Sequence, residues 1–127
     1  MNFFQIQGIL LPVMVILDLS WARINFHLVT ENTQKIQKGT QTRRRWWAIP
    51  LIYATMLATV AFICEPLVGV YGIWGGTLVG YVVHAVYNLC NYVAFDDQST
   101  LLCVIDTLWG MVLYTSLTSL SIFLAKA

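Results

Sequence analysis

Four long apolar stretches, separated by short polar segments, dominate the chain. They cover residues 4–27, 46–64, 73–94 and 101–124. An α-helix rises about 1.5 Å per residue, so about 20 residues cross the roughly 30 Å hydrocarbon core of a bilayer. A backbone that crosses lipid must also satisfy its own hydrogen bonds, which a helix does. The pattern therefore predicts an all-α membrane protein, built as an antiparallel bundle of four transmembrane helices in a single domain.

The composition supports the membrane class. Of the 127 residues, 58% are hydrophobic and 10% are charged, and the mean hydropathy is +0.70. A water-soluble chain of this length could not bury so much apolar surface. The three cysteines lie in or beside apolar stretches without ligand spacing, so we predict no disulfide, no metal site and no cofactor. No basic face extends through the chain, and we therefore predict no nucleic-acid partner.

The charged residues gather between the first two apolar stretches. Residues 29–45 hold five basic side chains against one acidic one, Glu31. Loops rich in Lys and Arg stay on the cytoplasmic side of a membrane, so we predict that this loop is cytoplasmic. The short acidic turn at 95–100 is then cytoplasmic too, and both termini are non-cytoplasmic. The residues that we expect to contact lipid headgroups or a partner protein are Arg43, Arg44, Arg45, Trp46 and Trp47.

Polar residues interrupt the first, third and fourth apolar stretches at helical spacing. In each stretch they fall on one face, and in all three they lie in the cytoplasmic half of the membrane. We therefore expect a buried polar cluster where these faces meet. Its predicted members are Asp18, Trp21, Asn25, His84, Tyr87, Asn88, Asn91, Asp106 and Trp109. The small residues expected to let helices pack closely are Gly76, Gly80 and Gly110.

The cluster has two interpretations, and the sequence leaves both open. A charged Asp at a helix centre costs about 2.5–3.5 kcal/mol on insertion scales, so we expect Asp18 and Asp106 each to have a role that offsets this cost. Either the cluster holds the helices together through interhelical hydrogen bonds, or it lines a wet cavity for a proton, cation or small polar solute. His84 and Asp106 form the sole conceivable acid and base pair, and no catalytic pattern accompanies them. We predict that the protein is not an enzyme.

Three motifs carry a resemblance to a known family. They are Asp18-x-x-Trp in the first helix, the run from Tyr87 to Asn91 in the third, and Asp106-x-x-Trp-Gly in the fourth. Together they resemble a family of small four-helix integral membrane proteins of unknown function, with members in bacteria and in large DNA viruses of algae. Family members usually have Tyr-Asp-Leu-Thr-Asn in the third helix, so Asn88 stands here in place of an acid. The resemblance implies the fold but no reaction.

The leading hypothesis from the sequence is a membrane scaffold or accessory subunit of a larger assembly. Its partners would be the lipid bilayer and either other proteins or further copies of the chain. The resemblance implies a virion internal membrane or a bacterial inner membrane as the setting, and a virion component as one form of the hypothesis. The alternative is a small transporter or channel for protons, cations or a small polar solute, with Asp18 and Asp106 as its sites.

Overall fold

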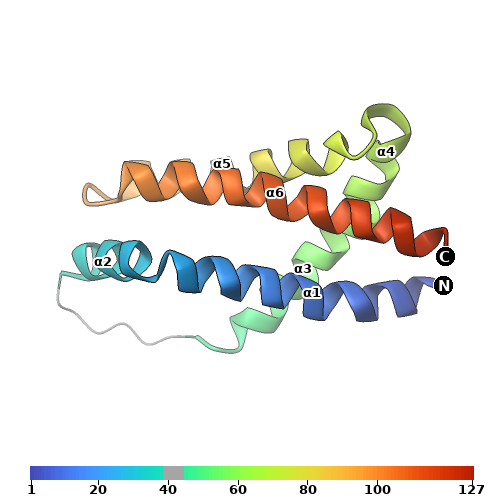
Figure 1. The fold of residues 1–127 in the computed structure, drawn as a ribbon. Helices are drawn as coiled ribbons and strands as arrows, with labels where there is room; N and C mark the ends of the chain where they lie inside the picture. Colours follow the sequence, from blue (N-terminus) through green and yellow to red (C-terminus); the bar gives the residue numbers. More distant parts are fainter. Residues whose placement is uncertain (39–44) are drawn as a thin grey trace.

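The computed structural model describes residues 1–38 and 45–127, and the regular structure in these residues is all helical, as predicted. Figure 1 shows α5 and α6 running side by side, with α1 along α6 and the α3–α4 stretch crossing them at an angle. In chain order the elements are α1 (Phe3–Ile24), α2 (Phe26–Gln37), α3 (Ala48–Thr59), the π-helical segment η1 (Val60–Cys64), α4 (Glu65–Tyr71), α5 (Trp74–Ala94) and α6 (Thr100–Ala125).

The first helix is capped at its start and broken at its end. The Asn2 side chain accepts a hydrogen bond from the Gln5 amide at 2.9 Å, and the Gln5 side chain accepts one from the Asn2 amide at 3.0 Å. These reciprocal bonds satisfy two amides that would otherwise lack partners. The helix breaks at Asn25, where φ is −100° and ψ is 19°. A second helix begins at the next residue.

That second helix, α2, corrects the predicted hydrophilic loop at 29–45. Residues 26–37 are helical, and Lys38 ends the helix in the left-handed conformation with a φ of 50°. The prediction was wrong here because the polar composition of the segment hid an amphipathic pattern. Apolar Val29 and Ile36 lie seven residues apart, which places them on one helical face.

The second apolar stretch also differs from the prediction. A continuous helical segment covers residues 48–71, so Glu65 and Pro66 do not end it at residue 64 as predicted. Pro66 has no amide hydrogen and would clash with the preceding turn of a regular helix. The turn before it is instead widened to a π-helix, in which the Glu65 amide donates to the carbonyl of Val60, five residues back. The chain reverses at Gly72, whose φ of +61° favours glycine.

Helices α5 and α6 form an antiparallel hairpin close to the predicted bounds of 73–94 and 101–124. The Ser99 hydroxyl accepts a hydrogen bond from the Leu102 amide at 3.2 Å and so caps α6. Glycines allow the two helices to touch. A Cβ on Gly80 would overlap the carbonyl of Gly110, and a Cβ on Gly76 would lie 2.7 Å from the Tyr114 carbonyl oxygen. The backbones are therefore closer than larger side chains would permit.

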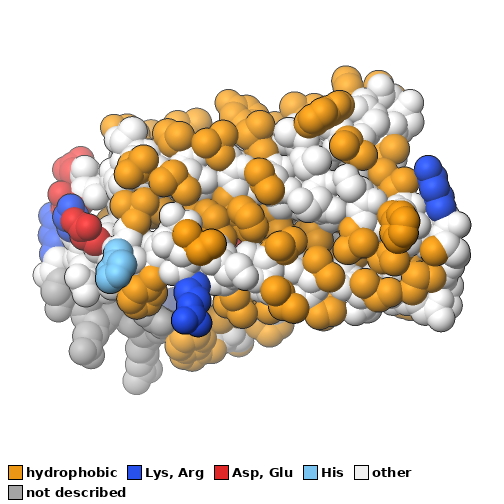
Figure 2. Space-filling view, viewed as in Figure 1, with side chains coloured by type: hydrophobic (Ala, Val, Ile, Leu, Met, Phe, Trp, Pro, Cys, Tyr) orange, Lys and Arg blue, Asp and Glu red, His pale blue; other side chains and the backbone are white. Residues whose placement is uncertain are grey.

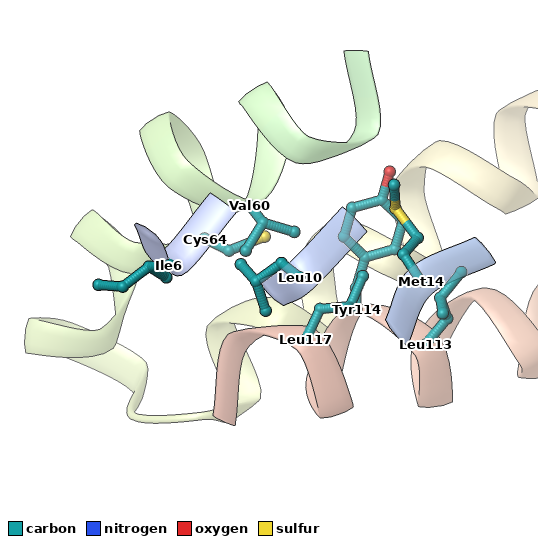
Figure 3. Close-up of a cluster of buried hydrophobic side chains, with 8 residues drawn as sticks. All are labelled: Ile6, Leu10, Met14, Val60, Cys64, Leu113, Tyr114 and Leu117. Carbon is teal, nitrogen blue, oxygen red and sulfur yellow. The ribbon is translucent and has the colours of Figure 1, made fainter. Parts of the chain in front are cut away.

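A hydrophobic core joins α1, η1 and α6 in one half of the bundle (Figure 3). It is built from the N-terminal half of α1 and the C-terminal half of α6, so it occupies the end of the molecule where the two termini lie (Figure 1). Its eight buried members are Ile6, Leu10, Met14, Val60, Cys64, Leu113, Tyr114 and Leu117. Of the predicted polar cluster, Asp18 and Trp21 lie in the other half of α1, and Asp106 and Trp109 lie in the other half of α6.

Three segments among the described residues are long and apolar enough to cross a membrane: Phe3–Ile24, Ala48–Tyr71 and Thr100–Ala125. Helix α5 is long enough, but His84, Asn88 and Asn91 lower its hydropathy. Figure 2 shows apolar side chains over the middle of the visible face, with most Lys, Arg, Asp and Glu side chains toward the ends. This distribution is typical of a protein that lies in a bilayer.

Candidate functional site

The two carboxylates that the sequence grouped together have partners on different helices. Asp18 of α1 accepts a hydrogen bond from the Tyr53 hydroxyl of α3 at 2.9 Å. Asp106 of α6 accepts one from the Asn88 amide of α5 at 2.7 Å. A pocket lies beside Asn88 and Asp106, and Asp18 does not line it. The predicted cluster is therefore divided, with Asp18 held against α3 and outside the pocket.

This half-open space, the polar pocket, has a volume of about 330 Å³. It lies between α2, the end of α1 and the α5–α6 hairpin, in the half of the bundle that the hydrophobic core does not fill. Small-molecule sites in proteins begin at about this size. The pocket is lined by Trp21, Val29, Asn32, Thr33, Ile36, Tyr87, Asn88, Asn91, Phe95, Gln98, Leu102 and Asp106.

Helix α2 forms one wall of the polar pocket. Its four lining residues, Val29, Asn32, Thr33 and Ile36, follow the spacing i, i+3, i+4 and i+7, which is one face of a helix. The opposite side of α2 carries an exposed ion pair between Glu31 and Lys35 at 2.9 Å, as expected for a solvated face. The sequence of α2 therefore builds a wall on one side and a charged surface on the other.

Asn32 fastens this wall to the α5–α6 turn. Its side-chain amide donates to the Gln98 side-chain oxygen at 3.2 Å, and its oxygen accepts from the Ser99 backbone amide at 2.7 Å. Asn32 is 7% exposed and Gln98 is 8% exposed. A buried amide that loses its partner carries an unfavourable desolvation cost, so these bonds fix the position of α2.

A chain of hydrogen bonds connects Gln98 to the Asp106 carboxylate. The Gln98 amide donates to the Cys103 sulfur at 3.5 Å, and the Cys103 thiol donates to the Asn88 carbonyl at 3.6 Å. Asn88 in turn donates from its side chain to Asp106, to the His84 carbonyl at 2.8 Å and to Thr107 at 3.3 Å. The wall and the carboxylate therefore belong to one hydrogen-bonded network.

Asp106 is the acidic group among the described residues that line the polar pocket, and none of those lining residues is basic. Among residues 1–38 and 45–127, the ion pair between side chains is that of Glu31 with Lys35, outside the pocket. A carboxylate in apolar surroundings is costly unless it is paired, protonated or hydrogen-bonded. Among the described residues, the bond from Asn88 engages Oδ2 of Asp106, and no bond engages Oδ1.

The predicted tryptophans lie together but not as hydrogen-bond donors to the acids. The rings of Trp21 and Trp109 stack with centroids 6.5 Å apart and an angle of 20° between their planes. Within the described chain, the buried indole nitrogen of Trp109 has no hydrogen-bond partner. Asn25 donates from its side chain to the carbonyl of Trp21 at 3.0 Å, so it satisfies the end of α1 rather than the cluster.

The remaining predicted residues lie along α5. His84 has its ring edge-on to Tyr114, with centroids 5.9 Å apart, and its Nδ1 is 3.2 Å from the Gly80 carbonyl oxygen. No hydrogen bond joins His84 to Asp106 in the described residues, which separates the conceivable acid and base pair. Asn91 and Tyr87 both line the polar pocket, although Tyr87 is 63% exposed.

Several partners were missed by the sequence interpretation. Glu65 accepts a hydrogen bond from the Ser121 hydroxyl, which links α4 to α6. The hydroxyls of Thr77 and Thr115 bond across the α5–α6 contact. The polar residues of the second stretch, including Tyr53, could have indicated these partners. An unpaired polar group in hydrocarbon requires a partner on another helix.

The predicted headgroup-binding residues are placed in part. Arg45, Trp46 and Trp47 precede α3 and are exposed, with Trp46 at 64% and Trp47 at 67%. Arg43 and Arg44 lie outside the described residues. Exposed aromatic residues at the end of an apolar helix are typical of membrane interfaces.

Fold and site together define the class: an α-helical membrane protein with a polar pocket at one end of an apolar bundle. Residues 4–123 match the family model described as "Predicted membrane protein (DUF2177)". The chain belongs to this family, which confirms the predicted resemblance to membrane proteins of unknown function and implies contact with lipid. No curated protein and no solved structure matches the chain significantly. The motifs and the bacterial and viral members stay predictions.

Proposed function

We propose that the protein binds a small solute in the polar pocket and carries it across the membrane. One observation supports this most: Asp106, with no basic partner in the described residues, lines a half-open pocket of about 330 Å³. Ionisable residues within membrane spans usually serve a ligand, ion or proton path. Asn88 and Asn91 add amides to the same pocket, so the site offers both charge and hydrogen bonds to a polar solute.

The pocket favours a carrier over an open channel. It is half-open and is lined by α2, whereas the hydrophobic core lies in the other half of the bundle between α1, η1 and α6. Leu10, Met14 and Leu117 in that core are fully buried. A solute in the pocket therefore meets a sealed barrier, and release on the other side requires the core helices to move, as in alternating access.

A carrier of this design also needs α5 within the membrane, and we propose four crossings. The Met1 amino group lies 3.3 Å from the Ala127 carbonyl oxygen, so the two termini are on the same side (Figure 1). Three crossings would separate them. Helix α5 runs antiparallel to α6, and its polar residues face protein rather than lipid at Asn88, which is 3% exposed. Four crossings would place both termini on the non-cytoplasmic side, given a cytoplasmic basic loop.

Uptake into proteoliposomes tests the carrier proposal. A panel of protons, inorganic cations, small amines and neutral polar solutes would be offered to vesicles with wild-type protein, with Asp106→Asn and without protein. We expect at least one solute to enter the wild-type vesicles, and Asp106→Asn to slow its uptake at least about tenfold, since a charge-assisted hydrogen bond contributes about 1.5–3 kcal/mol. Uptake equal to that of protein-free vesicles for every solute would overturn the proposal.

A second candidate is a scaffold or accessory subunit, as the sequence first indicated. The observation that favours it is the interhelical bonding of Asp18 with Tyr53 and of Glu65 with Ser121, which stiffens the bundle without lining the pocket. A virion membrane or a bacterial inner membrane would be its setting. Extraction in mild detergent followed by mass measurement tests it, because a scaffold retains partner chains or further copies, whereas a carrier of this size need not.

A further inference from the structure

The polar pocket has a charged end and an apolar remainder, and this division limits what it can bind. The oxygens and amides lie around Asp106, Asn88 and Asn91. The rest of the lining consists of six apolar residues and of Asn32, Thr33 and Gln98, whose side chains make hydrogen bonds within the protein. A ligand that matches both parts has one polar group and a short apolar body. The apolar lining residues are Trp21, Val29, Ile36, Tyr87, Phe95 and Leu102.

Asn88 and Asp106 present acceptors to the polar pocket, whereas the Asn91 amide and the Tyr87 hydroxyl in the same lining can also donate. The Asn88 side-chain amide already donates to Asp106, Thr107 and the His84 carbonyl, so its donor capacity is used within the protein. In the described part of the chain, no hydrogen bond engages Oδ1 of Asn88 or Oδ1 of Asp106. Both residues line the pocket. The ligand group that these free oxygens suit is a donor with positive charge.

Other ligands fit this lining less well. A calcium ion takes about six to eight oxygen ligands, and a magnesium ion requires an octahedral shell of ligands. The described residues contain no group of three or more His, Cys, Asp and Glu that could hold a metal ion. A proton alone needs no cavity of about 330 Å³. A neutral solute would leave the Asp106 charge without a counter-ion.

The aromatic lining favours an organic cation. Trp21 is held by stacking against Trp109, and Tyr87 and Phe95 lie on the α5 side of the same pocket. Aromatic rings attract cations through their quadrupole and also accommodate methylene groups. We infer that the polar pocket binds a primary organic ammonium ion with a short apolar chain, its nitrogen donating to Asp106 and Asn88. This inference rests on the proposed binding function.

The same ammonium group occurs in free amines and in the phosphatidylethanolamine headgroup. Titration calorimetry of the whole protein in maltoside micelles compares butylammonium with butan-1-ol, which replaces the ammonium by a hydroxyl, and with sodium ions. We expect butylammonium to bind at least tenfold more tightly than either. Asp106→Asn should abolish this preference, and circular dichroism would check that the variant is folded. Butylammonium and butan-1-ol differ in the charged group of the ligand, so their comparison in the wild-type protein tests the inference even where the Asp106→Asn variant unfolds.

Each outcome has a separate meaning. Tighter binding of sodium or of butan-1-ol would overturn the ammonium assignment and leave a solute-binding protein. Absence of binding by every probe, with no uptake in vesicles, would overturn the proposed function as well. Native mass spectrometry then identifies the source of the ammonium group. Retained phosphatidylethanolamine that butylammonium displaces, with no retention of phosphatidylglycerol, indicates the lipid headgroup; binding of butylammonium with neither lipid retained indicates a free amine.

Discussion

Gly80 and Gly110 determine how closely α5 and α6 approach. The space for a Cβ at Gly80 is occupied by the Gly110 carbonyl, and the space at Gly110 is occupied by the His84 ring. The positions of Asn88 and Asp106 on the same two helices depend on this separation, since their 2.7 Å hydrogen bond crosses the interface. Glycine here therefore serves packing, and the pocket is built on that packing.

Replacing Gly80 by Ala should destabilise the bundle. The new methyl group has no space, and overpacking of this kind costs about 1–3 kcal/mol. Gly8→Ala is the matched control, because nothing lies within 4 Å of a Cβ at Gly8 in α1. We expect Gly8→Ala to be neutral or slightly stabilising, since Ala favours helix over Gly. Unfolding in mixed detergent micelles measures both; equal stability of the two variants would contradict the close contact.

Asp18 shows how far single residues could be predicted. Helical spacing correctly identifies residues that need partners in the protein, because hydrocarbon supplies none. The spacing of one helix does not say which neighbour its polar face meets. Asp18 was grouped with Asp106, yet its bond is to Tyr53. Tyr53 lies in a stretch without Asp, Glu, Lys, Arg or His, so the sequence did not identify it as a partner. Partners depend on how helices are arranged, and that arrangement is set by packing of the whole bundle.

Helix α2 is the element that a reading by hydropathy alone could not find. Twelve polar-rich residues carry too few apolar positions for a membrane span, and the segment was predicted as a loop. Its role depends on Asn32, which reaches the turn at Gln98 and Ser99 more than sixty residues away. The widened turn before Pro66 could not be predicted either. A proline in a sequence indicates either the end of a helix or a distortion within it, and the sequence does not distinguish the two.

Asn32→Ala should release α2 from the polar pocket. The change removes two hydrogen bonds and leaves the buried Gln98 without one of its partners, at a cost of about 1–3 kcal/mol. Hydrogen exchange of the backbone amides in residues 26–37 should then accelerate, by about tenfold for each 1.4 kcal/mol of lost protection. Gln34→Ala, on the exposed side of the same helix, is the control. Unchanged exchange in Asn32→Ala, or equal acceleration in both variants, would show that Asn32 does not hold the helix.

At the scale of the whole molecule, the bundle divides into two halves with different chemistry. One half holds the hydrophobic core near the termini (Figure 1, Figure 3). The other half holds the polar pocket beside α2. The all-α fold and the apolar spans follow from periodicity in the sequence. The pocket does not, because residues of α1, α2, α5 and α6 and of the α5–α6 turn together form its lining.

Tags on the two termini test the proposed crossing number. Because Met1 and Ala127 are hydrogen-bonded at 3.3 Å, we expect epitope tags at both ends to be reached by antibody from the same side of sealed vesicles. A tag accessible at one end and protected at the other would mean an odd number of crossings, and α5 would then not span the membrane. Vesicles opened with detergent supply the control, since both tags must be detected there.

The two carboxylates provide the most direct test of the account, in which Asp106 binds the solute and Asp18 only joins helices. Calorimetric affinity for butylammonium would be measured with wild type, Asp106→Asn and Asp18→Asn. We predict that Asp106→Asn weakens binding at least tenfold, whereas Asp18→Asn stays within about twofold of wild type, because Asp18 lies outside the pocket. Equal weakening by both substitutions, or greater weakening by Asp18→Asn, would contradict the account.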